Sequence, residues 1–190
     1  MKRFLWVALS VALAAGLSGC APAANSAEQT PSATASDIWP TIDPSLIPPA
    51  ATPDLPTVNP ADYLATFTEY IFKIGTGPTW CSINEQNAIV TCEQDEAATQ
   101  YDPIPMPSTC DYSFGFQIRL HATVPTKGKV AEFTCSGGYY ADPSKAKVLE
   151  DGYSIKVAGF TCYTAGQTAR CDNSLGNYVV LGAKAWALGN

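Results

Sequence analysis

Few side chains in this chain have the types and spacing that catalysis needs. The 190 residues contain a single histidine, His121, and one Ser-x-x-Lys pattern, which runs from Ser144 to Lys147. A Ser-His-Asp site would use His121 as its base, but no Gly-x-Ser-x-Gly sequence is present, and an exposed strand position is the simpler interpretation. The Ser-x-x-Lys pattern follows Asp142 in an expected turn, and its usual Ser-Asp-Asn and Lys-Thr-Gly partners are missing. The sequence therefore predicts neither kind of nucleophile.

Carboxylates offer two further kinds of site. Glu93, Asp95 and Glu96 form an acidic run, and clustered carboxylates are ligands of Ca²⁺. Their spacing fits no known calcium loop, so we expect solvated charge, no bound metal and no cofactor. A glycan hydrolase would need a pair of carboxylates as acid and base. The candidates for such a pair are Glu132, Asp142, Glu150 and Asp151.

Two adjacent aromatic residues are the candidate ligand-binding residues. Tyr139 and Tyr140 directly follow the pair Gly137-Gly138. Exposed aromatic rings can stack on a sugar or a peptide. Neighbouring residues of a strand point to opposite faces, so we expect one ring in the core and the other on the surface.

The charge balance excludes one class of partner. The chain has 17 Asp and Glu residues against 11 Lys and Arg, which gives a formal net charge of −6. Binding to phosphate backbones needs clustered Lys and Arg, and no basic cluster is present. We therefore expect no nucleic-acid partner.

The first 20 residues have the pattern of an export signal. Two positive charges, Lys2 and Arg3, precede an apolar run over residues 4–16, which is typical of an export signal and too short to span a bilayer. The sequence Leu17-Ser18-Gly19-Cys20 that follows resembles the lipobox of bacterial lipoproteins. That resemblance implies a signal peptide over residues 1–19, acylation of Cys20 (as palmitate labelling would show) and attachment to the extracytoplasmic face of the cell membrane. The alternatives are a plain secretory signal with a chance cysteine, or an uncleaved anchor.

A tether is expected between Cys20 and Pro60. Nine of the 15 prolines lie here among Ala, Ser and Thr, without any Lys or Arg. Such a composition buries too little apolar surface to fold alone and favours extended polyproline conformations. Trp39, Ile42 and Leu46 are more apolar than a spacer requires, so an arm docked on the folded part is the alternative.

Residues 61–190 form the expected folded domain, and cysteines dominate its chemistry. Six of the seven cysteines lie here, and none forms a Cys-x-x-Cys pair. With only one histidine in the chain, a zinc site is not expected. An exported chain folds in an oxidising compartment, so we expect three disulfides.

Two of these disulfides follow from hairpin patterns. Cys81 and Cys92 flank a polar turn centre, and Cys162 and Cys171 flank a turn around Gly166. Antiparallel arms bring such pairs to disulfide distance. Cys110 then pairs with Cys135 by elimination, with the Pro-rich stretch over residues 103–107 folding back to deliver Cys110.

The remaining pattern predicts a mainly β fold. Residues 116–124 alternate between apolar and polar side chains, as in a strand with one buried face. Further strands are expected at residues 70–74, 153–160 and 178–181, and residues 183–188 are ambiguous. Asn59-Pro60 fits the start of a short N-terminal helix. The prediction is a small antiparallel β-sandwich or a curled sheet.

The cysteine and glycine spacing over residues 72–181 resembles a small exported domain, common in actinobacteria, whose function is not characterised. The matching features are Gly75 and Gly77 before Cys81, then Cys92, Pro103, Pro105 and Pro107 before Cys110, Gly115-Phe116, Cys135-Ser136-Gly137-Gly138, Phe160-Thr161-Cys162 with Cys171, and Gly176 before Tyr178. The resemblance implies pairing of neighbouring cysteines in sequence order. It implies no catalytic residues.

Together these patterns favour a cell-envelope lipoprotein that is not an enzyme. The expected role is a binding or structural module outside the cytoplasm, with a cell-wall glycan or an envelope protein as partner. A cell-wall or glycan hydrolase is the first alternative, and a protease inhibitor or surface antigen is the second.

Overall fold

The computed structural model describes residues 39–52 and 54–190. The expected signal peptide, Cys20 and the tether as far as residue 38 lie outside the described residues. No helix in the described part of the chain is long and apolar enough to cross a membrane.

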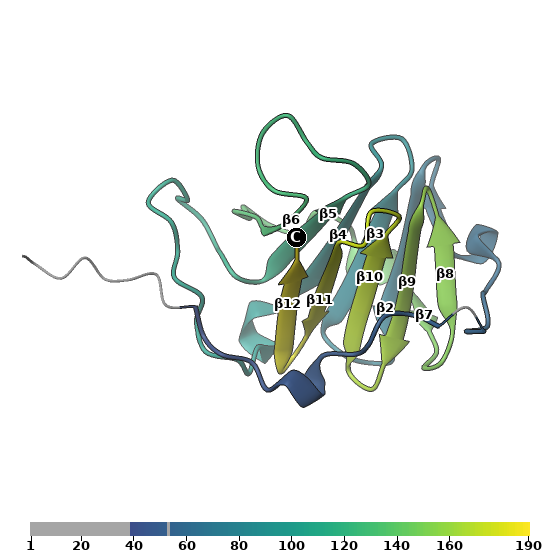
Figure 1. Ribbon diagram of the computed structural model, residues 1–190, viewed down its shortest axis with the longest axis horizontal. Helices are drawn as coiled ribbons and strands as arrows, with labels where there is room; N and C mark the ends of the chain where they lie inside the picture. Colours follow the sequence, from purple (N-terminus) through teal and green to yellow (C-terminus); the bar gives the residue numbers. More distant parts are fainter. Residues whose placement is uncertain (1–38, 53) are drawn as a thin grey trace, which may run out of the picture. The chain divides into compact units, whose positions relative to one another are not determined.

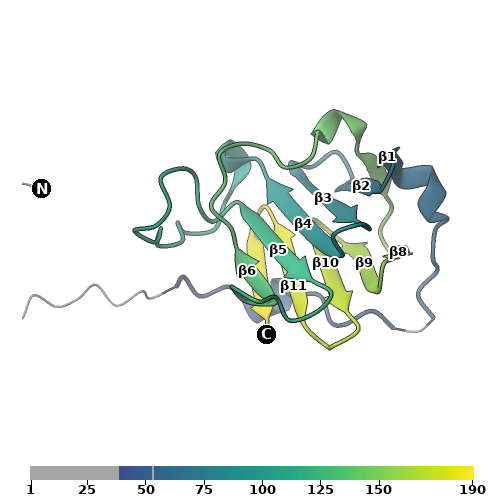
Figure 2. The ribbon, with the colours of Figure 1, turned by 90° about the horizontal axis from the view of Figure 1, so that it is seen from above.

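Two antiparallel β-sheets pack face to face as a sandwich (Figures 1 and 2). The first sheet has the order β1-β2-β3-β4-β5-β6, and β7 adds to β2 as the one parallel pair among the described strands. Its strands are β1 (Leu64–Thr66), β2 (Glu69–Ile74), β3 (Thr79–Asn84), β4 (Ile89–Gln94), β5 (Gln117–His121), β6 (Ala131–Phe133) and β7 (Lys147–Leu149). The second sheet has the order β12-β11-β10-β9-β8. Its strands are β8 (Ser154–Val157), β9 (Phe160–Ala165), β10 (Thr168–Asn173), β11 (Tyr178–Gly182) and β12 (Ala185–Gly189).

Alternating side chains explain why the two sheets face each other. Ile118 and Leu120 of β5 are completely buried between the sheets, while Arg119 and His121 point to the opposite face and are only half buried. The strand predicted over residues 116–124 is therefore present, but it is shorter, since its pairing with β4 runs only from Gln117 to His121. The predicted mainly β, antiparallel fold is confirmed.

Two disulfides occupy the centre of this core. Cys81 lies directly opposite Cys92 on β3 and β4, and Cys162 lies directly opposite Cys171 on β9 and β10, so each disulfide bridges one hairpin. The sulfur atoms of Cys81, Cys92 and Cys171 all lie within 4.8 Å of one another. The two hairpins are thus in contact through their sulfur atoms. These sulfur atoms are bonded in disulfides and are not free thiolates that could bind a metal.

The third disulfide joins Cys110 to Cys135, and a folded loop delivers Cys110, as the prolines predict. Ile104 is buried within this loop, and the hydroxyl of Tyr101 donates a 2.6 Å hydrogen bond to the carbonyl of Gly115. Gly115 has a φ of +96°, and a Cβ there would lie 3.2 Å from Cβ of Ile104. Both facts favour glycine at this position.

The helical turns of the described chain are four short 3₁₀ segments, Pro44–Leu46, Pro60–Tyr63, Glu96–Ala98 and Pro143–Lys145. The helix predicted from Asn59-Pro60 is the second of these. Asn59 caps it by accepting a hydrogen bond from the backbone N–H of Ala61, and Pro60 occupies the first position. The chain then continues as strand β1, which leaves Phe67 fully exposed at the β1–β2 turn. The ambiguous C-terminal segment is strand β12.

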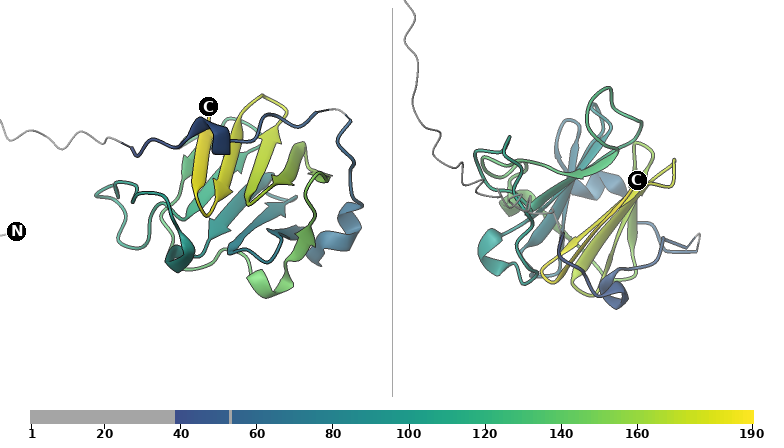
Figure 3. Two further views of the ribbon diagram at one scale, coloured as in Figure 1. Left: turned by 90° about the horizontal axis from the view of Figure 1, so that it is seen from below. Right: turned by 60° about the vertical axis from the view of Figure 1, so that its left-hand side comes forward.

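Residues 39–52 and 54–58, here called the strap, lie against the sandwich rather than free of it (Figures 1 and 3). The ring of Trp39 packs on Phe133 and Trp186 at centroid distances of 5.6 and 5.4 Å. Further along, Arg170 donates a 2.8 Å hydrogen bond from Nη1 to the carbonyl of Pro48. The alternative of a docked arm therefore holds for this part of the expected tether.

We expect the two core disulfides to be energetically coupled. The double variants Cys81→Ala/Cys92→Ala and Cys162→Ala/Cys171→Ala should each lower the free energy of unfolding by about 3 kcal/mol. The sulfur atoms of the two disulfides are in contact, so their contributions should not be additive. The loss of unfolding free energy in the quadruple variant should differ by roughly 1 kcal/mol from the sum of the losses in the two double variants. Chemical denaturation of the full chain measures these values, with Cys110→Ala/Cys135→Ala as the reference pair outside the core. Strict additivity of the two core pairs would contradict the coupling.

Candidate functional site

A pocket of about 400 Å³ opens where β4 ends and β5 begins. Three segments line it: the end of β4 with the acidic run that follows, the loop before β5, and the loop after β6. The lining residues are Glu93, Gln94, Asp95, Glu96, Tyr112, Ser113, Phe116, Gln117, Ser136, Gly137, Gly138 and Tyr139. Its size suits one small ligand or one residue of a larger one.

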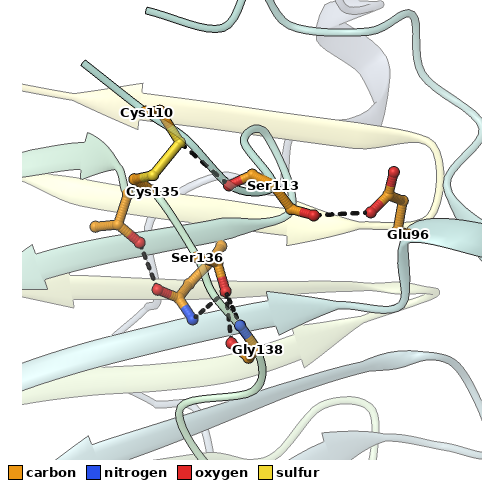
Figure 4. Close-up of a disulfide and its surroundings, with 8 residues drawn as sticks. Glu96, Cys110, Ser113, Cys135, Ser136 and Gly138 are labelled. Atoms are coloured by element: carbon orange, nitrogen blue, oxygen red, sulfur yellow. Dashed lines mark hydrogen bonds between the residues drawn. A yellow bond between two sulfur atoms is a disulfide. The ribbon is translucent and has the colours of Figure 1, made fainter.

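The Cys110–Cys135 disulfide ties two of these segments together (Figure 4). Ser113 and Ser136 exchange backbone N–H···O bonds of 3.0 and 2.9 Å, which form an isolated antiparallel bridge just beyond the disulfide. Ser113 Oγ also donates a 3.1 Å hydrogen bond to Glu96 Oε2 (Figure 4). One disulfide and one serine pair therefore fix the loops that shape the pocket.

Glu93 anchors the pocket from beneath. Its side chain is only 2% exposed and accepts four hydrogen bonds, two at each oxygen. The donors are Trp80 Nε1 and the Ala141 N–H to Oε2, at 3.0 and 2.9 Å, and Gln117 Nε2 and the Tyr140 N–H to Oε1, at 2.9 and 2.5 Å. Four donors use the full acceptor capacity of a carboxylate. One side chain thus joins β3, β5 and the loop after β6.

Two tyrosine rings stand at the rim of the pocket. Tyr139 is 61% exposed, and its ring meets Trp80 edge to face at a centroid distance of 4.9 Å. Tyr112 is 68% exposed and lies beside Gly137, where a Cβ would come within 3.8 Å of its ring. Because Trp80 is itself hydrogen-bonded to Glu93, the position of Tyr139 depends on the buried carboxylate.

Of the two sequence-predicted tyrosines, only Tyr139 lines the pocket. The expectation that one of the two rings lies in the core is wrong, since Tyr140 is 41% exposed. The reason is that residues 137–142 form a loop held by backbone bonds to Glu93 rather than a strand. Tyr140 contributes its N–H to the site, not its ring.

The four hydrolase carboxylates lie outside this pocket, and three of them have local partners. Asp142 caps the 3₁₀ turn Pro143–Lys145, and the Ser144 hydrogen bonds lower the pKa of Asp142. Glu132 accepts a 3.2 Å hydrogen bond from the Lys129 N–H, and Asp151 accepts one of 2.9 Å from the Gly166 N–H. Glu150 is exposed beside Asp151. None of the four lines the pocket.

The Ser-x-x-Lys residues and the histidine also lie apart from the pocket. The hydroxyl of Ser144 donates a 2.7 Å hydrogen bond to Asp142, while the ammonium of Lys147 lies 5.2 Å from the centroid of the Tyr63 ring. Ser144 and Lys147 therefore have different partners. His121 is half buried on β5, and burial together with the Arg119 guanidinium lowers its pKa.

A second hollow, of about 500 Å³, lies between the strap and the β9–β10 turn. Its walls are largely aliphatic side chains and prolines, and Lys184 is the one charged residue among those that line it. It brings no aromatic ring together with a carboxylate, so the pocket at the end of β4 is the better candidate.

Sequence reasoning did not identify Tyr112, Gln117 or Ser136 as site residues. Ser136 lies about 20 residues further along the chain than Tyr112 and Gln117, and it meets their segment beside the Cys110–Cys135 disulfide, through the bridge between Ser113 and Ser136. The sequence does show the acidic run of residues 93–96, for which it predicts solvated charge. Glu93 departs from that interpretation because it is buried, whereas Glu96 is exposed as expected.

No family model, no curated protein and no solved structure matches this chain. The resemblance to an exported actinobacterial domain therefore stays a prediction.

Replacing Glu93 with Gln should disturb the pocket and weaken the fold. The amide keeps the size of the side chain but replaces one acceptor oxygen with a donor, so two of the four donors lose their partner. We expect the free energy of unfolding to fall by roughly 3 kcal/mol, since hydrogen bonds to buried charged groups are among the stronger ones. Denaturation of the full chain measures this, and Trp80 fluorescence reports the local change.

Glu132→Gln is the matched control, because Glu132 accepts one backbone bond at a hairpin turn and is only half buried. An equal loss of stability in the two variants would contradict the prediction, because the four bonds to Glu93 would then contribute no more than the single bond to Glu132.

Proposed function

We propose that this chain is a lipid-anchored, extracytoplasmic binding module without catalytic activity. The observation that carries the proposal is the pocket at the end of β4, in which two exposed tyrosine rings and several polar groups are held by a disulfide and a buried carboxylate. Such a rigid, preformed concave site with aromatic walls is typical of ligand binding. The partner we propose is a cell-wall glycan or an envelope protein.

The arrangement of the carboxylates favours binding over hydrolysis. Glycoside hydrolysis needs one carboxyl group that donates a proton and a second that acts as base or nucleophile. All acceptor positions of Glu93 are already used by fixed donors, which leaves Asp95 and Glu96 in the pocket. Asp95 Oδ1 accepts the N–H of Ala97, and Glu96 accepts the hydroxyl of Ser113. These two side chains are engaged in shaping the loops.

The anchoring part of the proposal rests on the lipobox-like sequence before Cys20 and on the disulfides of the fold. Disulfides persist in oxidising, extracytoplasmic compartments. All six cysteines of the sandwich are paired with one another, which leaves Cys20 as the one cysteine outside these bonds. Two acyl chains on Cys20 would give stable membrane attachment.

Replacement of Cys20 by Ala should abolish metabolic labelling of the chain with palmitate. Without the two acyl chains, only the uncleaved signal peptide would hold the variant at the membrane. Its partitioning into the detergent phase should therefore fall, which detergent phase separation measures. Ser26→Ala, in the same expected tether, is the control and should leave labelling unchanged. Undiminished labelling of Cys20→Ala would remove the lipoprotein part of the proposal.

The binding part predicts that the full chain, purified in detergent, retains envelope glycan fragments or an envelope protein in pull-downs. The double variant Tyr112→Ala/Tyr139→Ala should lose at least about tenfold in affinity, since aromatic anchors dominate binding energies. Tyr153→Ala is the matched control, because Tyr153 is 45% exposed on a different loop. Retention of the partner by the pocket variant, or turnover of a glycan by the wild type, would refute the proposal.

A further inference from the structure

The pocket at the end of β4 is lined by negative charge without compensation. Three carboxylates line it, from Glu93, Asp95 and Glu96, and its lining contains no Lys, Arg or His. The ion pair found in the described part of the chain, between Arg170 and Asp172, belongs to the second sheet. Lys73 lines a neighbouring hollow that shares Asp95 and Tyr139, but it does not line this pocket.

The hydrogen bonds to the buried carboxylate bring no positive charge to it. All four donors to Glu93 are neutral groups, so they satisfy its lone pairs without cancelling its charge. Glu69 lies on the same face of the sheet as Glu93. Burial and the Glu93 carboxylate together raise the pKa of Glu69. A concave site with walls of one sign focuses this field into its opening.

The aromatic residues of the pocket are matched to the same kind of ligand. Tyrosine rings attract a cation to their faces through the ring quadrupole. Tyr112 and Tyr139 are exposed at the rim of the pocket. Tyr139 is held there by its edge-to-face contact with Trp80. Carboxylates beneath and aromatic rings at the rim are the two groups that recognise an ammonium ion.

The other polar groups of the pocket are neutral, and the donors of Gln117 and Ser136 are already hydrogen-bonded within the protein. Ser136 Oγ lies 2.5 Å from the Gly138 carbonyl and 3.4 Å from Gln117 Nε2. Gln94 is 3% exposed, and its Nε2 has no partner among the described residues. Its side chain follows Glu93 on β4 and so lies on the opposite face of the sheet, against Thr79, which leaves ligand recognition to the carboxylates and the rings.

We propose that this pocket binds the ammonium group of an organic cation about the size of one sugar or one amino-acid residue. The inference rests on the proposed binding function and deepens it by naming the ligand chemistry. The cation sits between the rings of Tyr112 and Tyr139, with Asp95 and Glu96 as counter-charges and Glu93 as the buried source of the field. An amino sugar and a lysine side chain both carry this group.

Calorimetric titration of the full chain in a nonionic detergent tests the proposal. The probes are glucosamine against glucose, and Nα-acetyl-lysine methylamide against the norleucine analogue, which lacks the ammonium group. Tetramethylammonium tests the cation alone, and Ca²⁺ tests an inorganic cation. We expect each ammonium probe to bind at least about tenfold more tightly than its neutral counterpart, and this preference to weaken as salt screens the carboxylates. The stronger of the glucosamine and lysine arms identifies the source of the ammonium group.

Two pairs of variants connect the binding to the pocket. Asp95→Asn/Glu96→Gln removes two charges while Asn keeps the cap of the 3₁₀ turn, and it should weaken ammonium binding at least about tenfold. Glu150→Gln removes an exposed charge elsewhere and should have no effect. Tyr112→Leu should weaken binding about threefold, whereas Tyr112→Phe keeps the ring face and should bind as the wild type does.

Preferential ammonium binding that responds to these variants supports the proposal. Three results overturn it: equal affinity for the neutral counterparts, binding of Ca²⁺ in place of the ammonium probes, or ammonium binding that the pocket variants leave unchanged. Tight binding of glucose at the pocket would refute the charge inference while it left the proposed binding function intact.

Discussion

The contact between two disulfides at the centre of the sandwich is the constraint on which the rest of the structure depends. Each disulfide joins directly opposite residues of one hairpin, β3–β4 in the first sheet and β9–β10 in the second. Their sulfur atoms meet within 4.8 Å. A small sheet pair with short edge strands gains little from its periphery, so it needs a dense centre. Bulky sulfur pairs that restrict both hairpins provide it.

With the centre fixed, the functional loops at one end are positioned by a separate set of bonds. The Cys110–Cys135 disulfide and the Ser113–Ser136 bridge set the distance between two loops, and Glu93 ties a third segment to them. Glu93 has both a structural and an electrostatic consequence. It holds Trp80, and through it Tyr139, while its charge remains unopposed by any cation in the lining of the pocket.

The parts of this molecule that could be predicted from the sequence are those with a local signal. The alternation around Ile118 and Leu120, and the spacing of the cysteines around polar turns, each describe one strand or one hairpin, and all three disulfides join the expected pairs. The site was only partly predictable. Tyr139 stood out by its glycine-rich loop, but burial of Glu93 depends on donors from β3, β5 and a distant loop, which no short window of sequence contains. The helix expected after Asn59 likewise ended after one turn, because the following residues pair with β2.

The strap has a consequence for how far the sandwich can travel. An anchor at Cys20, as proposed, would leave at most residues 20–38 between the bilayer and Trp39, the first docked side chain of the described residues. Fully extended at ~3.3 Å per residue, a tether of residues 20–38 reaches about 60 Å, whereas a tether that ran to Pro60 would reach about 130 Å. The volume swept by the pocket above the membrane then shrinks to roughly a tenth, because it scales with the cube of the radius. Docking of the strap on the sandwich would thus confine the search for a ligand to the layer nearest the bilayer.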